Sequence, residues 1–146
     1  MKLTNEQIEW LNSCHGWAYL KGKWTFNEET GLVDVDGDFK TPNSHNSCKA
    51  LGRNGGKRYR SIADFMGIKF GTVTGDFDCS YNNLTNLEGA PIYVGGNFWC
   101  CDRWNDPHLE SLQGAEECII GGDFDCHYNK LKRWILILNI CLICYP

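Results

Sequence analysis

The chain has 146 residues, 42% of them hydrophobic, which suffices for one domain with a substantial core but not for two well-separated domains. Its formal net charge of -4 argues against a surface built throughout for nucleic acid, although it does not exclude a local basic patch. The first 20 residues carry Glu6, Glu9 and His15, so the sequence predicts neither a signal peptide nor a transit peptide. Nine cysteines, several at apolar positions, favour buried thiols in a reducing cytoplasm over a disulfide framework.

Residues 1–36 predict an N-terminal cap made of a helix and a β-hairpin. Thr4 and Gln7 have the spacing of a capping box, and the apolar residues that follow share one face of a short helix ending near Gly16. Residues 23–36 place apolar side chains on both sides of a Glu-Glu-Thr-Gly turn, which is typical of a hairpin. A repeat array needs such a cap because an open end exposes apolar surface and an unpaired strand edge.

Residues 37–134 repeat one short pattern. Three copies align as GDFDCSYNNLTNLEGAP from Gly75, GNFWCCDRWNDPHLESLQGA from Gly96 and GDFDCHYNKLKRW from Gly122. A fourth copy opens at Gly37 and closes with residues 62–67, and the insertion 41–61 fills its middle. Strand alternation sends the Phe and Cys of each Phe-x-Cys inward. The spacing of 21 and 26 residues between successive phenylalanines predicts a leucine-rich type of solenoid, with strands on one face and loops or irregular coil on the other.

Three further positions of the repeat have predicted structural roles. Asn82 lies where the chain must turn, and its side-chain amide is expected to bond backbone groups of the bend. Leu84 and Leu87 are expected to fill the interior.

The pattern VTGDFDCSYNNLTNLEGAP followed by YVGGNF, with KLTNEQIEWL and TGLVDVDGDF before it, resembles the degenerate leucine-rich-repeat proteins common in bacteriophage genomes. The resemblance covers roughly residues 1–39 and 62–134. It implies a mainly β repeat solenoid with an N-terminal cap, no catalytic residues and no cofactor. The departures from the family lie at 40–61, at 103–108 and after Trp134. The apolar end 135–146 predicts a final strand or cap, because the 13 residues from Trp134 are too few for a membrane helix.

Stacked strands place equivalent outward residues in rows about 4.8 Å apart. Trp99, flanked by carboxylates, predicts an anchor for a basic protein surface, since tryptophan is enriched at binding hot spots and the charges would steer a cationic partner. The alternative is a solvated face whose aspartates resist edge-to-edge association. The row that contains Trp99 consists of Lys40, Asp78, Trp99 and Asp125. The row two residues earlier consists of Asp38, Asp76, Asn97 and Asp123.

A third row consists of Ser80, Cys101 and His127, with Asp102 and Asp125 expected close by. A thiol beside an imidazole is the minimum for an activated nucleophile. A gently curved sheet offers neither an oxyanion hole nor a pocket, so the sequence favours a protein that is not an enzyme. No metal is predicted either, because the CxxC of 141–144 has no second pair nearby and apolar flanks.

The insertion 41–61 is the main basic segment. Glycines beside arginine and lysine side chains are suited to binding phosphate, although their sequence does not match a Walker motif. Tyr59 is suited to stacking on a base. A solvated loop and a contact with an acidic protein are the alternatives. The second insertion lies at or near the same edge, so the two are expected to form one composite surface. The candidate residues are Arg53, Asn54, Lys57, Arg58, Tyr59 and Arg60, with Arg103 and Trp104 from the second insertion.

Together these features predict a non-catalytic binding protein. The phage resemblance implies an accessory protein that binds and inhibits a host defence protein in the host cytoplasm. The alternative is a nucleic-acid or nucleotide-binding module that uses the basic insertion. No membrane contact is expected.

Overall fold

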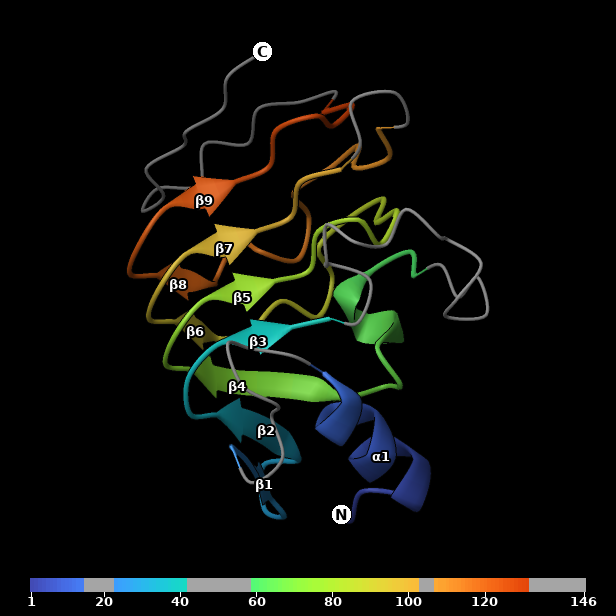
Figure 1. The fold of residues 1–146 in the computed structure, drawn as a ribbon, viewed down its shortest axis with the longest axis vertical. Coiled ribbons are helices and arrows are strands. Elements are labelled where there is room, and N and C mark those ends of the chain that lie inside the picture. Colours follow the sequence, from blue (N-terminus) through green and yellow to red (C-terminus); the bar gives the residue numbers. More distant parts are fainter. Residues whose placement is uncertain (15–22, 42–58, 103–106, 132–146) are drawn as a thin grey trace.

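The computed structural model describes residues 1–14, 23–41, 59–102 and 107–131 (Figure 1). This part of the chain is mostly β structure with one α-helix, and its strands form two sheets. All strand pairs are parallel except the hairpin β1–β2. The five-stranded sheet has the order β1 (Trp24–Asn27), β2 (Leu32–Val35), β4 (Lys69–Val73), β6 (Tyr93–Val94), β8 (Ile119–Ile120). The four-stranded sheet has the order β3 (Phe39–Lys40), β5 (Phe77–Asp78), β7 (Phe98–Trp99), β9 (Phe124–Asp125).

The chain alternates between the two sheets from β2 onward. Each strand of the five-stranded sheet is followed by one of the four-stranded sheet, and each pairs with the strand one unit earlier. Figure 1 shows the resulting ladders rising together, from β2 and β3 to β8 and β9. The sequence predicted one row of strands, at the Phe-x-Cys positions. The structure has two rows, because short apolar pairs such as Tyr93–Val94 and Ile119–Ile120 form a second ladder.

The predicted N-terminal helix is confirmed as α1 (Asn5–Ser13), with Thr4 as its N-cap. The Gln7 backbone N–H donates to Thr4 Oγ1 at 3.2 Å, and the Thr4 N–H donates to Gln7 Oε1 at 2.9 Å, which completes the capping box. Trp10 packs against Phe65, with ring centroids 5.7 Å apart. The helix therefore packs on the core beside Phe39 and Phe65.

The predicted hairpin is also confirmed. Strand β1 pairs antiparallel with β2, from Trp24 opposite Val35 to Asn27 opposite Leu32. Gly31 closes the turn at a φ of 71°, in the left-handed region that glycine enters without steric strain.

A column of phenylalanines forms the centre of the core. Successive ring centroids are 4.9, 5.2 and 5.3 Å apart, and all four side chains are fully buried. Buried thiols follow two residues after three of these rings, and burial raises the pKa of Cys79 and that of Cys100. The inward placement of Phe and Cys is thus confirmed. The residues are Phe39, Phe77, Phe98 and Phe124, with Cys79, Cys100 and Cys126.

An asparagine closes the bend after two of the strands. Asn82 Nδ2 donates to the carbonyl oxygen of Cys79 at 2.8 Å and to that of Ser80 at 3.2 Å. Asn129 Nδ2 repeats the first contact with the carbonyl of Cys126, also at 2.8 Å. The role predicted for Asn82 is confirmed. Leu84 and Leu87 are buried as predicted.

The first copy of the pattern closes through a 3-10 helix, η1 (Ile62–Asp64). Ile62 and Phe65 are fully buried, like Leu84 and Leu87 one unit later. The Ala63 N–H donates to the carbonyl oxygen of Glu88 at 2.7 Å, which joins the two units at this point. The predictions for residues 42–58, for 103–106 and for the apolar end 135–146 concern segments outside the described residues.

Candidate functional site

The outer face of the four-stranded sheet carries one row of side chains from four strands. The pairing registers place Lys40 beside Asp78, Asp78 beside Trp99, and Trp99 beside Asp125. The row expected from the repeat alignment is therefore present; we call it the outer row. Trp99 lies between the two aspartates, and 39% of its surface is exposed. An indole in this position offers a large apolar area that a partner can cover.

Both aspartates of the outer row have partners within the chain. Asp78 Oδ2 lies 2.8 Å from Lys40 Nζ. Asp125 Oδ1 contacts His127 Nδ1. The side chains of Asp78 and Asp125 are 15% and 22% exposed. The face is therefore less negative than the sequence indicated, because Lys40 offsets the charge of Asp78.

The row before it lies at the corner where the chain passes between the sheets, and three of its four side chains accept a backbone N–H. Asp76 Oδ1 accepts the Asn97 N–H at 2.7 Å, Asp38 Oδ1 accepts the Asp76 N–H at 2.8 Å, and Asn97 Oδ1 accepts the Asp123 N–H at 2.8 Å. We call these four residues the corner ladder. One carboxylate oxygen of Asp76, which was predicted as a binding residue, is thus already hydrogen-bonded to the backbone of the next strand connection.

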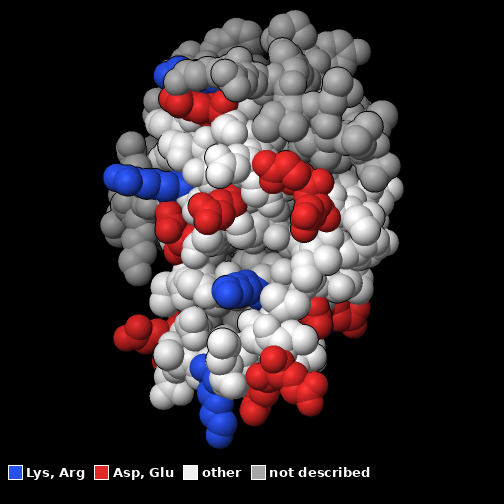
Figure 2. Space-filling model, turned by 180° about the vertical axis from the view of Figure 1, so that it is seen from behind, with Lys and Arg blue, Asp and Glu red and all other residues white. Residues whose placement is uncertain are grey.

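Negative charge is not confined to this sheet. Figure 2 shows the side of the molecule opposite to the view in Figure 1, where acidic side chains gather in several patches and basic ones stand apart from one another. This distribution agrees with the formal net charge of -4. Charge alone therefore does not distinguish the outer row from the rest of the described surface, whereas the exposed indole does.

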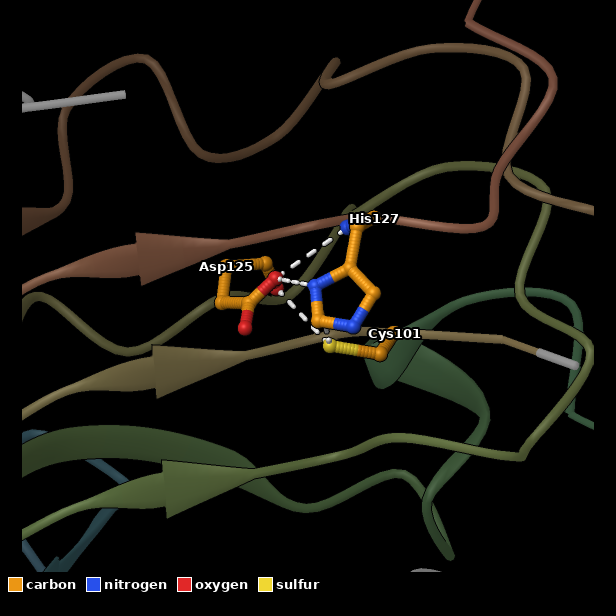
Figure 3. Close-up of side chains that lie close together, drawn as sticks. All are labelled: Cys101, Asp125 and His127. Carbon is orange, nitrogen blue, oxygen red and sulfur yellow. Dashed lines mark hydrogen bonds and ion pairs between the residues drawn. The ribbon is translucent and has the colours of Figure 1, made fainter. Parts of the chain in front are cut away.

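Cys101, Asp125 and His127 converge beside the outer row, and we call them the Cys–Asp–His cluster (Figure 3). Cys101 Sγ lies 3.7 Å from His127 Nδ1 and 3.6 Å from the backbone carbonyl oxygen of Asp125. The Cys101 N–H donates to Ser80 Oγ at 3.2 Å, and the His127 N–H donates to Asp125 Oδ1 at 3.2 Å. The proximity of thiol and imidazole predicted from the alignment is confirmed.

The electrostatics of this cluster disfavour a reactive thiolate. Cys101 is 7% exposed, and burial, followed by the charge of Asp125, raises the pKa of its thiol. His127 also meets both groups through the same nitrogen, Nδ1. In a nucleophile–His–acid triad the two ring nitrogens are divided between the nucleophile and the carboxylate. A nitrogen that donates to Asp125 has no lone pair left to take the thiol proton.

A small hollow lies next to the cluster. Its lining includes Asn82, Leu84, Cys101, Asp102 and Leu109. Asp102, expected beside the thiol, instead directs its carboxylate to His108, with Asp102 Oδ2 3.0 Å from His108 Nδ1. Residue spacing alone does not predict this pair, because His108 stands at the end of an insertion.

The five-stranded sheet carries exposed apolar side chains that sequence reasoning missed. Tyr93 and Ile119 lie side by side in register on β6 and β8, and they are 39% and 57% exposed. Ile92, 56% exposed, precedes Tyr93. This surface could have been found only by predicting the second sheet.

Most residues of the predicted basic surface lie outside the described residues: Arg53, Asn54, Lys57 and Arg58 of the first insertion, and Arg103 and Trp104 of the second. The composite surface expected from the two insertions lies there as well. Arg60 is described and exposed. Tyr59 is 9% exposed, and its ring packs edge-on against Phe65 with centroids 4.7 Å apart. This place in the core counts against the predicted stacking of Tyr59 on a base.

Comparisons with protein-family models, curated protein sequences and solved structures find no match for this chain. Within the described ranges, every helix is too short or too polar to span a bilayer.

Proposed function

We propose that the chain is a short leucine-rich type of solenoid that acts as a non-catalytic binding protein. The alternation of strands between two ladders, the phenylalanine column and the asparagine at the bend support the solenoid. The resemblance of the repeat sequence to the degenerate leucine-rich-repeat proteins of bacteriophages supports the solenoid independently.

The observation that carries the binding proposal is the exposure of Trp99 in the middle of the outer row. The side chain projects from a paired strand, so its backbone is already ordered before a partner arrives. Tryptophan is among the residues that contribute most to protein interfaces, and solenoids bind partners along extended sheet surfaces. The partner is a protein whose contact surface has an apolar recess for the indole.

The phage resemblance makes this proposal more specific. Small phage accessory proteins without catalytic residues act by occupying a surface of a host protein, and a host defence protein is the partner class that we propose. The single nitrogen shared by thiol and carboxylate in the Cys–Asp–His cluster supports a non-enzymatic role.

The test is a photocrosslinking experiment in the host. A photoreactive phenylalanine analogue replaces Trp99 in one variant and Tyr93 in another, because both residues are 39% exposed but lie on different sheets. We expect a discrete protein adduct from position 99 that excess unlabelled chain competes away, and none from position 93. A competed adduct from position 93 and none from position 99 would exclude the outer row as the binding surface.

Affinity measurements with the captured partner complete the test. We expect Trp99→Ala to weaken binding by about 2 kcal/mol, roughly 30-fold in Kd, and Tyr93→Ala to leave it unchanged. An interface centred on an indole weakens little with salt, whereas phosphate binding weakens steeply. Nuclease-sensitive capture with a steep salt dependence would favour the alternative of a nucleic-acid-binding module.

A further inference from the structure

The Cys–Asp–His cluster brings three kinds of metal-ligating atom to one point. A thiol sulfur, an imidazole nitrogen and a carboxylate oxygen, from Cys101, His127 and Asp125, all lie within 4.8 Å of one another. The three residues come from the ends of two adjacent strands, β7 and β9, whose register is fixed by the pairing of Trp99 with Asp125. The convergence is therefore built into the sheet.

The separation between the thiol and the imidazole fits a tetrahedral ion, whereas the Asp125 carboxylate contacts His127 Nδ1 directly and has to turn aside to make room for the ion. With metal–sulfur and metal–nitrogen bonds of about 2.3 and 2.0–2.1 Å, two tetrahedral ligands lie roughly 3.6 Å apart. The observed separation between Cys101 Sγ and His127 Nδ1 is 3.7 Å. By contrast, a neutral imidazole nitrogen can serve only one of its two neighbours, since it carries either one hydrogen or one lone pair. A cation in place of the Cys101 thiol proton and the His127 Nδ1 hydrogen would bring the sulfur, the nitrogen and the carboxylate into one site.

The surroundings also hold the ligands in place. The Cys101 N–H is bonded to Ser80 Oγ at 3.2 Å, and the Asp102 N–H is bonded to the carbonyl oxygen of His127 at 3.3 Å. The ring of Tyr128 packs edge-on against the His127 ring, with centroids 4.5 Å apart. Such second contacts fix the orientation of metal ligands in proteins.

We propose that Cys101 Sγ, His127 Nδ1 and the Asp125 carboxylate bind a zinc ion, with the fourth coordination position open. Thiolate and imidazole together favour zinc over magnesium or calcium, which prefer oxygen ligands. Binding releases the thiol proton to solvent, moves the imidazole hydrogen from Nδ1 to Nε2 and forms the Zn–S and Zn–N bonds, so no oxidant or reductant is needed. This departs from the sequence analysis, which predicted no metal because it considered cysteine pairs rather than three residues from two strands.

The experiment uses the full reduced chain. Zinc is titrated in competition with a chromogenic chelator, and Co²⁺ is added separately as a spectroscopic probe. We expect one ion per chain at this site, a thiolate-to-Co²⁺ charge-transfer band and the intense visible bands of tetrahedral Co²⁺. Cys101→Ser and His127→Ala should each weaken zinc binding by about 100-fold or more, and Cys101→Ser should also abolish the charge-transfer band.

Two controls separate this site from other cysteines. Cys118→Ser removes another buried thiol from the described chain and should leave the Co²⁺ spectrum unchanged. The double variant Cys141→Ser/Cys144→Ser removes the CxxC and should also leave it unchanged. Near-ultraviolet circular dichroism without metal verifies that each variant is folded. A charge-transfer band that survives in folded Cys101→Ser, or one that disappears only with the CxxC, would overturn the proposal, as would no band in the unaltered chain.

Discussion

The Asp76 side chain and the Asn97 backbone are joined by a hydrogen bond of 2.7 Å that links one strand connection to the next. Asp38 and Asn97 make the equivalent bonds before and after it. We expect Asp76→Ala to reduce the free energy of unfolding by about 1–2 kcal/mol, because the Asn97 N–H loses its acceptor in a partly buried place. Urea denaturation followed by circular dichroism measures this change.

The matched control is Asp123→Ala, at the same position of the last described copy. The Asp123 side chain is exposed, so its loss should change the free energy of unfolding by no more than about 0.5 kcal/mol. Equal effects of the two substitutions would contradict the structural role of the corner ladder.

Gly96 is required at the corner because of the same hydrogen bond. A Cβ added there would meet Asp76 Oδ1 and lie 2.9 Å from the carbonyl carbon of Gly75. Gly96→Ala should therefore reduce the free energy of unfolding by about 1–3 kcal/mol. In a double-mutant cycle, Asp76→Ala combined with Gly96→Ala should reduce it by less than the two single effects added, because one of the colliding groups has been removed. Strict additivity would show that the side-chain collision is unimportant.

Phe98 and Trp99 are neighbours on β7 that face opposite sides of the sheet. Phe98 is fully buried between Phe77 and Phe124, so Phe98→Ala should reduce the free energy of unfolding by about 3–5 kcal/mol, and Phe98→Leu by less. Trp99→Ala should reduce it by clearly less than Phe98→Ala, because 39% of the Trp99 surface is already exposed. Thermal and urea denaturation compare the variants. A large loss of stability in Trp99→Ala would mean that its effect on partner binding reflects unfolding.

The buried thiols should lower the free energy of unfolding at alkaline pH. Burial raises the pKa of Cys14 above that of an unfolded thiol, which is about 8.5. Above this pH the unfolded chain loses the Cys14 proton while the folded chain keeps it, so the free energy of unfolding decreases as pH rises towards the folded pKa. The slope is at most about 1.4 kcal/mol per pH unit for each such thiol.

Cys14→Ala isolates the contribution of this group. Urea denaturation in reductant between pH 8 and pH 10 should show a shallower decrease in this variant than in the unaltered chain. The slope with pH is the readout, because loss of the side chain also lowers stability at every pH. Identical slopes would contradict a raised pKa for Cys14.

Local patterns in the sequence were sufficient for the elements that depend on near neighbours. The capping box needs only Thr4 and Gln7, three residues apart, and the hairpin needs only its own turn. The alternation in Phe77-Asp78-Cys79 determines which side chains face inward once the strand pairs with its neighbour. The repeat alignment then placed Cys101 beside His127 without further information.

The features that could not be predicted from the sequence depend on contacts between one unit of the ladder and the next. Strands of two residues, such as Tyr93–Val94, have no periodicity of their own and exist because a parallel neighbour pairs with them. In the sequence, Asp38 and Asp76 of the corner ladder cannot be told from ordinary surface aspartates, although their side chains accept backbone N–H groups. The orientation of the His127 ring, which directs one nitrogen to both thiol and carboxylate, is a rotamer choice that residue spacing does not determine.

The four phenylalanines of the core column meet in register although 38, 21 and 26 residues separate them along the chain. The pairing therefore tolerates connections of very different length, provided that each one returns to the same point of the ladder. New segments can be spliced between these fixed points without redesign of the interior. The interior therefore places little restriction on what the connections present to solvent.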